Sequence, residues 1–213
     1  MNFKLVIFDW DGTLMDSVAR IVSSMQATAL DCELPVPSAP AVRDIIGLSL
    51  YKALPILFAG INERQAEQLL TVYRRHYMEL NQTPAPLFMG AADTIKNLHA
   101  NGYQLAVATG KQRAGLDSVL ADTQLTGYFH ALRGADQALS KPHPLMLEQI
   151  LAELNLTPSE AVMVGDSSYD LEMAQAIGMS RIGVTYGVHD AARLNQHQPV
   201  ALIDDIRHLR QWL

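Results

Sequence analysis

The sequence predicts a doubly wound α/β protein whose parallel sheet is interrupted once by a helical insertion. Short apolar runs with β-branched members recur along the 213 residues, and segments with helical periodicity lie between them. Continuously apolar runs are typical of parallel strands, because helices cover both faces of such a sheet. One long span, from Asp16 to about Pro86, has no such run and therefore marks the insertion.

Six apolar runs are expected to form the sheet. The first is Leu5–Phe8, and the others are 105–108, 131–132, 161–164, 182–184 and 200–203, of which 131–132 is the weakest. Apolar residues recur at helical spacing over 91–100, 144–156 and 171–177, which are therefore expected to be helices. Strands that alternate with helices in this order predict an open, doubly wound sheet.

The insertion is expected to be helical. Apolar residues repeat at helical spacing from Val18 to Met25 and again from Ala66 to Tyr77. Proline-rich stretches at 34–40 and 83–86 punctuate the span. The expected division is an α/β core of residues 1–15 and 87–213 and an inserted helical domain of residues 16–86.

Composition and charge argue against several classes of protein. Lys and Arg total 16 and Asp and Glu total 22, which gives a net charge of −6 without a basic run, whereas nucleic-acid binders usually carry the opposite balance. The single cysteine, Cys32, excludes an internal disulfide and favours a reducing compartment. Neither a signal peptide nor an apolar stretch long enough to span a membrane is visible. We expect a soluble, cytoplasmic protein with no nucleic-acid or membrane partner.

Candidate functional residues share one property, which is that they follow or lie close to the ends of expected strands. Ligands in open α/β sheets bind outside the carboxyl ends of the strands, so these residues should converge in space. Each alone has an ordinary structural explanation, such as a turn, a helix cap or a solvated lysine. The set is Asp9, Asp11, Thr109, Gly110, Lys141, Asp166 and Asp170.

The carboxylates in this set predict a metal site. Four carboxylates crowded at one sheet edge would repel one another, and several would have to stay protonated. A divalent cation removes that problem, and an all-oxygen ligand set with room for water and phosphate suits Mg²⁺. Lys141 would supply a further positive charge next to a bound phosphate.

Four segments together resemble the signature motifs of the haloacid dehalogenase superfamily. They are D-W-D-G-T-L from Asp9, V-A-T-G-K ending at Lys111, S-K-P-H-P from Ser140 and G-D-S-S-Y-D from Gly165. Their order and spacing match over essentially the whole chain. The stretch G-D-S-S-Y-D-L-E-M-A-Q-A-I-G-M is especially similar to the phosphoglycolate phosphatase-like branch. The resemblance implies a Rossmann-like core, and it identifies the helical insertion as an α-helical cap domain.

The resemblance also implies a role for each residue. Asp9 would attack phosphorus and form an aspartyl-phosphate, and Asp11 would act first as general acid and then as general base. Thr109 and the Gly110 amide would hold the phosphoryl oxygens, and Lys141 would neutralise the charge that builds up. The implied Mg²⁺ ligands are Asp9, the Asp11 backbone carbonyl and Asp166, with Asp170 ligating directly or in support.

Two positions depart from the family pattern. The second motif commonly has Asn after Ser or Thr, whereas here Gly110 follows Thr109, so a side-chain amide is missing. This difference puts a close analogy of substrate in doubt more than the type of reaction. Trp10 is bulkier than the usual residue between the two aspartates, and an effect on packing alone would account for it.

Substrate choice is expected to depend on the cap. The segment 43–49 is similar to the one that carries the specificity loop in capped relatives, with Gly47 expected to end a helix and Ser49 to cap the next. Arg43, Gly47, Ser49 and Lys52 are therefore candidate substrate contacts, although solvated helix faces would also explain the two cations.

The favoured function is a magnesium-dependent phosphatase acting on a small phosphorylated metabolite, with phosphoglycolate as the first choice. A β-phosphoglucomutase-like phosphoryl transferase shares the motifs, and a non-catalytic metabolite-binding module is a third possibility of another class. A dehalogenase is disfavoured because those relatives lack the second aspartate, here Asp11. A binding module would be expected to have lost part of the catalytic set, which is intact in this chain. The sequence leaves monomer and homodimer equally open.

Overall fold

A computed structural model describes residues 3–213, and in it six strands form one parallel sheet in the order β3-β2-β1-β4-β5-β6. The strands are β1 (Leu5–Phe8), β2 (Gln104–Ala108), β3 (Ala131–Arg133), β4 (Ala161–Gly165), β5 (Ser180–Val184) and β6 (Ala201–Ile203). Each overlaps an apolar run expected to be a strand. The central strand β1 pairs with β2 on one side and β4 on the other, so Ile7 lies level with both Ala106 and Met163.

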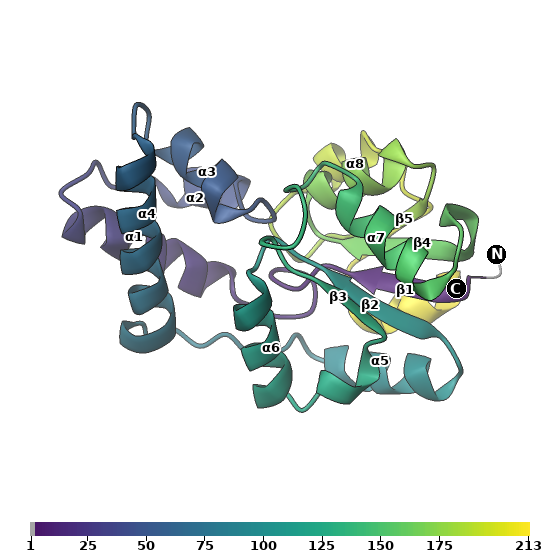
Figure 1. Cartoon of the computed structure of the whole chain (residues 1–213). Helices are drawn as coiled ribbons and strands as arrows, with labels where there is room; N and C mark the ends of the chain where they lie inside the picture. The colour runs from purple at the N-terminus through teal and green to yellow at the C-terminus, as the bar shows by residue number, and fades with distance from the viewer. Residues whose placement is uncertain (1–2) are drawn as a thin grey trace.

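Helices cover both faces of the sheet, as the continuous apolar runs predict (Figure 1). Val6 and Phe8 contribute to the core beneath α5 (Ala91–Ala100), α6 (Arg113–Asp122) and the 3₁₀ helix η4 (Ile206–Trp212). Leu5 and Ile7 point to the other face, where they pack with α7 (Leu145–Leu154) and α8 (Ser168–Ala176). Alternate residues of one strand thus support two cores, and this arrangement confirms the doubly wound fold.

Between β1 and α5 the chain is helical, and it forms a separate apolar cluster beside the sheet (Figure 1). The helices are α1 (Val18–Asp31), α2 (Ala39–Asp44), α3 (Leu50–Leu57), α4 (Glu63–Arg75) and the π-helical turn η1 (His76–Leu80). Ser49 caps α3 by accepting a hydrogen bond from the Lys52 amide, as the sequence predicts. The expectation that Gly47 ends a helix is wrong, because the preceding helix, α2, ends at Asp44, three residues before Gly47.

The two connections between the helical region and the sheet run side by side. Met15 forms an antiparallel bridge with Leu87, and the Asp16 amide donates to the Pro86 carbonyl over 2.8 Å. The expected boundaries at 15/16 and 86/87 therefore lie next to each other, although the division into domains stays a prediction. The remaining short elements are the 3₁₀ turns η2 (Thr126–Tyr128) and η3 (Pro158–Glu160) and helix α9 (Ala191–Asn195).

Within residues 3–213, no helix combines the length and the apolar character needed to cross a bilayer.

Candidate active site

The site lies at the carboxyl edge of the three central strands. Asp9 follows β1, Thr109 follows β2 and Asp166 follows β4, and these strands are neighbours in the sheet. Lys141 reaches the same place from the loop before α7, and Asp170 reaches it from the first turn of α8. The order of strands reverses at β1, and ligands in doubly wound sheets bind at such a reversal.

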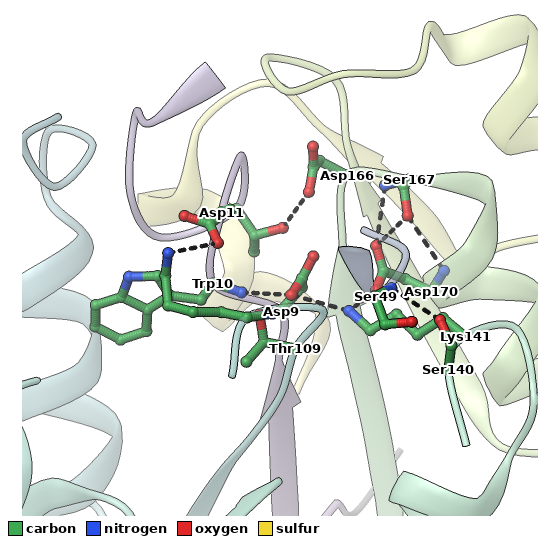
Figure 2. A network of polar contacts seen from close by, with 12 residues as sticks. Asp9, Trp10, Asp11, Ser49, Thr109, Ser140, Lys141, Asp166, Ser167 and Asp170 are labelled. Atoms are coloured by element: carbon green, nitrogen blue, oxygen red, sulfur yellow. Dashed lines mark hydrogen bonds and ion pairs between the residues drawn. The ribbon is translucent and has the colours of Figure 1, made fainter. Parts of the chain in front are cut away.

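Asp9 is buried at the centre of this group, with 1% of its surface exposed. Its Oδ1 accepts hydrogen bonds from the Trp10 amide at 2.7 Å and from Lys141 Nζ at 2.9 Å (Figure 2). Burial raises the pKa of Asp9 well above its ordinary value, Lys141 lowers it, and Asp170 and Asp166 raise it further. Among residues 3–213, no donor contacts Oδ2, so this oxygen is available to a substrate or a cation.

Lys141 is fully buried, which excludes the solvated surface position that a single lysine usually occupies. Its Nζ lies 2.6 Å from Asp170 Oδ1 and 2.9 Å from Asp9 Oδ1. Burial alone would lower the pKa of Lys141, but Asp170 and Asp9 together raise it above its usual value. Lys141 therefore stays charged and forms ion pairs with both Asp9 and Asp170.

Asp170 is held by the start of its own helix. Ser167 caps α8, and Asp170 Oδ2 accepts from the Ser167 amide at 3.0 Å and from Ser167 Oγ at 2.7 Å. This is a capping box with Asp in place of the usual Glu or Gln. Oδ1 of Asp170 faces the Lys141 ammonium and Oδ2 already accepts from two donors, an arrangement that favours a supporting position over direct metal ligation.

Asp166 is fixed from two directions. Its Oδ1 accepts from Thr13 Oγ1 at 2.7 Å and its Oδ2 accepts from the Val188 amide at 2.9 Å. Burial and the charge of Asp170 raise the pKa of Asp166 to about 7. The surrounding backbone is closely packed, since a Cβ added at either Gly12 or Gly187 would lie 2.2 Å from an Asp166 side-chain atom.

A divalent cation fits these residues. Asp9, Asp166 and Asp170 each offer a carboxylate oxygen, the three oxygens lie within 4.8 Å of one another, and all three residues are buried. Among the described residues, Lys141 is the one cation that contacts this cluster directly, so the carboxylates outnumber the cations. Hard oxygen donors with an excess of negative charge match the preference of Mg²⁺.

Asp11 faces the same site but has separate partners. Ser17 Oγ donates to its Oδ1 at 2.7 Å, and Lys111 Nζ lies 3.1 Å from its Oδ2. Burial would lower the pKa of Lys111, whereas Asp11 and Tyr77 raise it above its usual value. Neither Lys111 nor Ser17 was assigned a role from the sequence. Lys111 could have been found, because it lies within the second motif. A serine six residues after Asp11 gives no signal by itself.

Thr109 and Gly110 follow β2 and precede α6. Thr109 is 1% exposed, and its Oγ1 accepts from the Lys111 amide at 3.2 Å. Gln112 is the N-cap of α6, so Thr109 is not an ordinary helix cap. A Cβ at Gly110 would lie 2.6 Å from the Leu48 carbonyl oxygen and 2.7 Å from that of Gly47. The missing side chain therefore leaves room for the cap backbone.

Trp10 points away from the site and is fully buried in the core (Figure 2). Its ring makes an edge contact with Phe129, with centroids 6.4 Å apart, and its Nε1 donates to Met15 Sδ at 3.3 Å. Its bulk therefore serves packing.

A cavity of about 380 Å³ opens between the site and the helical region. Asp9, Asp11, Thr109 and Gly110 line its core side, and Gly47 lies on its cap side. The other three candidate substrate contacts, Arg43, Ser49 and Lys52, lie outside this lining and contact neighbouring loops instead. The Ser49 amide donates to Ser140 Oγ at 2.8 Å, Lys52 Nζ to the Lys141 carbonyl at 3.3 Å, and Arg43 to the Gly187 carbonyl at 3.0 Å.

Known proteins resemble this chain in sequence. The "Probable phosphatase IndB" of Dickeya dadantii (strain 3937) is 37% identical over 94% of this chain and 89% of its own length. A phosphoglycolate phosphatase of Pseudomonas putida (strain KT2440) is 30% identical over 97% of this chain and 78% of its own length.

The fold is found in solved structures as well. The crystal structure of a predicted phosphoglycolate phosphatase from Haemophilus somnus 129Pt superimposes with a TM-score of 0.88 at 26% identity, covering 99% of this chain and 98% of that one. Residues 6–184 match the family described as haloacid dehalogenase-like hydrolase, and this stretch holds every strand-end residue described above. The chain therefore belongs to the haloacid dehalogenase-like hydrolase family.

Proposed function

We propose that this hydrolase is a magnesium-dependent phosphatase that cleaves a small phosphomonoester through an aspartyl-phosphate on Asp9. The observation that carries the proposal is the buried Asp9 carboxylate, which Lys141 and the Trp10 amide hold by Oδ1 while no donor from residues 3–213 contacts Oδ2. A second carboxylate, Asp11, lines the same cavity and can serve the leaving group.

In the first step, an Asp9 oxygen forms a bond to phosphorus and the ester P–O bond breaks. Asp11 gives its proton to the departing alkoxide, so the products are an alcohol and an acyl phosphate on Asp9. Ser17 and Lys111 fix the two oxygens of Asp11, and this contact directs the carboxyl group into the cavity. Thr109 and the Gly110 amide are suited to hold phosphoryl oxygens, because both line the cavity beside Asp9.

In the second step, Asp11 removes a proton from water, and the resulting hydroxide attacks the phosphorus of the acyl phosphate. Inorganic phosphate leaves and the Asp9 carboxylate is regenerated. Lys141 offsets the negative charge on Asp9 in both steps. Phosphoryl transfer needs mainly such positioning and charge stabilisation, so these residues suffice.

Asp9 and Asp166 would hold the magnesium ion, with Asp170 in support and the Asp11 backbone carbonyl as a further ligand. The ion supplies positive charge that stabilises the phosphoryl group during transfer. The names of similar proteins make phosphoglycolate the first ester to test as a substrate.

The test is release of inorganic phosphate from a panel of small phosphomonoesters in the presence of Mg²⁺. We expect activity in the wild type, and we expect a loss greater than the ~10²–10⁴-fold effect of a single acid–base residue in Asp9→Asn, because the amide is a poor nucleophile of the same shape. Asp93→Asn, which neutralises an exposed carboxylate on α5, is the matched control and should keep full activity.

Removal of the metal belongs to the same experiment. Excess chelator should abolish phosphate release and added Mg²⁺ should restore it, because the carboxylates around Asp9 would otherwise repel the phosphate dianion. Full activity in chelator would contradict the metal requirement. More than about a percent of wild-type activity in Asp9→Asn would contradict the role of Asp9.

A further inference from the structure

The wall of the active-site cavity is predominantly apolar, although the cavity serves a phosphorylated substrate in the proposed function. Ile21 of α1, Leu50 of α3, Tyr73 of α4 and Val119 of α6 face it, and Ile45, Ile46 and Leu48 line it between α2 and α3. The charged and polar residues of the reaction gather on the core side around Asp9, Asp11 and Thr109. A substrate that places its phosphate at Asp9 would therefore extend its organic group among apolar side chains.

Of residues 3–213, two cations line this cavity, Lys111 and Arg74, and Lys111 is paired with a carboxylate. Lys111 Nζ lies 3.1 Å from Asp11 Oδ2, 3.4 Å from Tyr77 Oη and 4.7 Å from the centre of the Tyr77 ring. Arg74 donates to the neutral Gln112 Oε1 at 2.7 Å, and because this arginine is exposed, water solvates its charge. Since Arg43 and Lys52 contact backbone carbonyls outside the lining, no other Lys or Arg of residues 3–213 lines this cavity.

The volume of the cavity also favours a substrate with a larger organic group than that of phosphoglycolate. Its volume of about 380 Å³ falls in the range of about 300–1,000 Å³ that is typical of pockets for drug-sized ligands. Phosphoglycolate is a two-carbon acid that would leave much of this apolar wall uncovered. Its carboxylate would also lose water among apolar side chains, where Lys111 is already paired with Asp11 and the exposed Arg74 is the remaining Lys or Arg of residues 3–213 in the lining.

We propose that the substrate is a phosphomonoester whose organic group is uncharged and largely apolar, so that it packs against the cavity wall on the cap side. This inference rests on the proposed phosphatase function and narrows it to a class of substrate. Burial of apolar surface supplies the binding free energy, while the carboxylates and Lys141 position the phosphate. The alternative is that a second acid group of the substrate binds Arg74, or binds Lys111 after this lysine leaves Asp11.

The first measurement compares two esters of nearly the same shape. Isobutyl phosphate differs from phosphoglycolate in that a branched pair of methyl groups replaces the two carboxylate oxygens. We expect kcat/KM to be at least about tenfold higher for isobutyl phosphate, and higher again for benzyl phosphate, which covers more of the wall. A preference for phosphoglycolate over both esters would overturn the inference while leaving the phosphatase function intact. Hydrolysis of none of the esters would overturn the phosphatase function, and the inference with it.

The second measurement changes the wall. Leu50→Lys introduces a cation into the lining, and it should shift the kcat/KM ratio toward phosphoglycolate by about tenfold or more. Ile56→Lys is the matched control, because Ile56 lies on the same helix, is 59% exposed and is outside the lining. Circular dichroism of both variants checks that the helix is retained. An equal shift of the ratio in both variants would contradict the inference.

The variant Lys111→Met tests whether Lys111 contacts only Asp11 or also binds an acid group of the substrate. If this lysine only positions Asp11, both esters should lose activity together, and their kcat/KM ratio should stay within about twofold of wild type. A selective loss of phosphoglycolate hydrolysis would mean that Lys111 binds the substrate carboxylate, and it would overturn the inference. An effect of the substitution on Asp11 lowers kcat/KM for both esters alike, so it cancels in their ratio.

Discussion

Lys141 is the residue on which the charge balance of the site depends. It is fully buried and contacts both Asp9 and Asp170, so the two carboxylates share one ammonium group. Removing one partner of a buried ion pair leaves an uncompensated charge in a low-dielectric interior, and this is far more costly than losing an exposed pair.

Lys141→Met should lower the free energy of unfolding by about 3–5 kcal/mol, because two buried carboxylates would then face each other without a cation. Urea denaturation in chelator measures the change, and Lys96→Met on the exposed side of α5 is the control. Adding Asp170→Asn to the first variant removes one of the opposed charges and should recover part of the loss. A double variant no more stable than the single one would contradict this explanation.

Part of the site could be predicted from the sequence residue by residue. Asp9, Thr109 and Asp166 directly follow apolar strand runs, and this placement alone brings them to one edge. Ser17 and Lys111 were not assigned roles, since their contacts with Asp11 depend on where α1 and α6 begin. A hydrogen bond between side chains of different elements leaves no periodic trace in a sequence.

At the scale of elements, the cap rests on the core through a contact that only glycine allows. The carbonyls of Gly47 and Leu48 approach Gly110 so closely that a Cβ there would lie 2.7 and 2.6 Å from them. Gly47 has a φ of +103°, a backbone conformation that residues with a side chain rarely adopt. A Cβ added at Gly47 would lie 2.9 Å from Ser167 Oγ. These two glycines therefore set the distance between the 47–48 segment and the loop that follows β2.

Gly110→Ala should displace the 47–48 segment and lower kcat/KM by about tenfold or more, because small misplacements in an active site carry large kinetic costs. Its melting temperature should change much less than its activity. Gly127→Ala is the matched control, since a Cβ at Gly127 would have no atom of residues 3–213 within 4 Å. Steady-state kinetics with thermal melts would show both effects, and wild-type kinetics in Gly110→Ala would contradict the close contact.

Elements with a clear apolar pattern were predictable, and elements without one were not. The strands were found because each is buried on both faces and reads as a continuous apolar run. The helix α6 was not predicted, because Gly115 and several polar residues interrupt its apolar stripe of Leu116 and Leu120. The helix α2 has six residues and one buried side chain, too few for a helical repeat to be visible.

At the scale of the whole molecule, strand order makes one site from distant segments. The order β3-β2-β1-β4-β5-β6 places β1 between β2 and β4, so residues separated by more than 150 positions in the chain become neighbours. The sequence predicted a sheet with convergent strand ends, but it contains no direct record of which strands pair. The apolar cavity wall could not be predicted either, because it combines α1, α3, α4 and α6 with the 45–48 segment.

The most direct test of the central claim is detection of the phosphoryl group on Asp9. In Asp11→Asn the second step loses its general base, so the aspartyl-phosphate should persist while a nitrophenyl phosphate, with its good leaving group, still allows the first step. Acid quenching followed by mass spectrometry should then find one phosphoryl group on the peptide that contains Asp9, and none in the Asp9→Asn variant. Release of phosphate by this Asp11 variant with Asp9 unmodified at every time point would contradict the account.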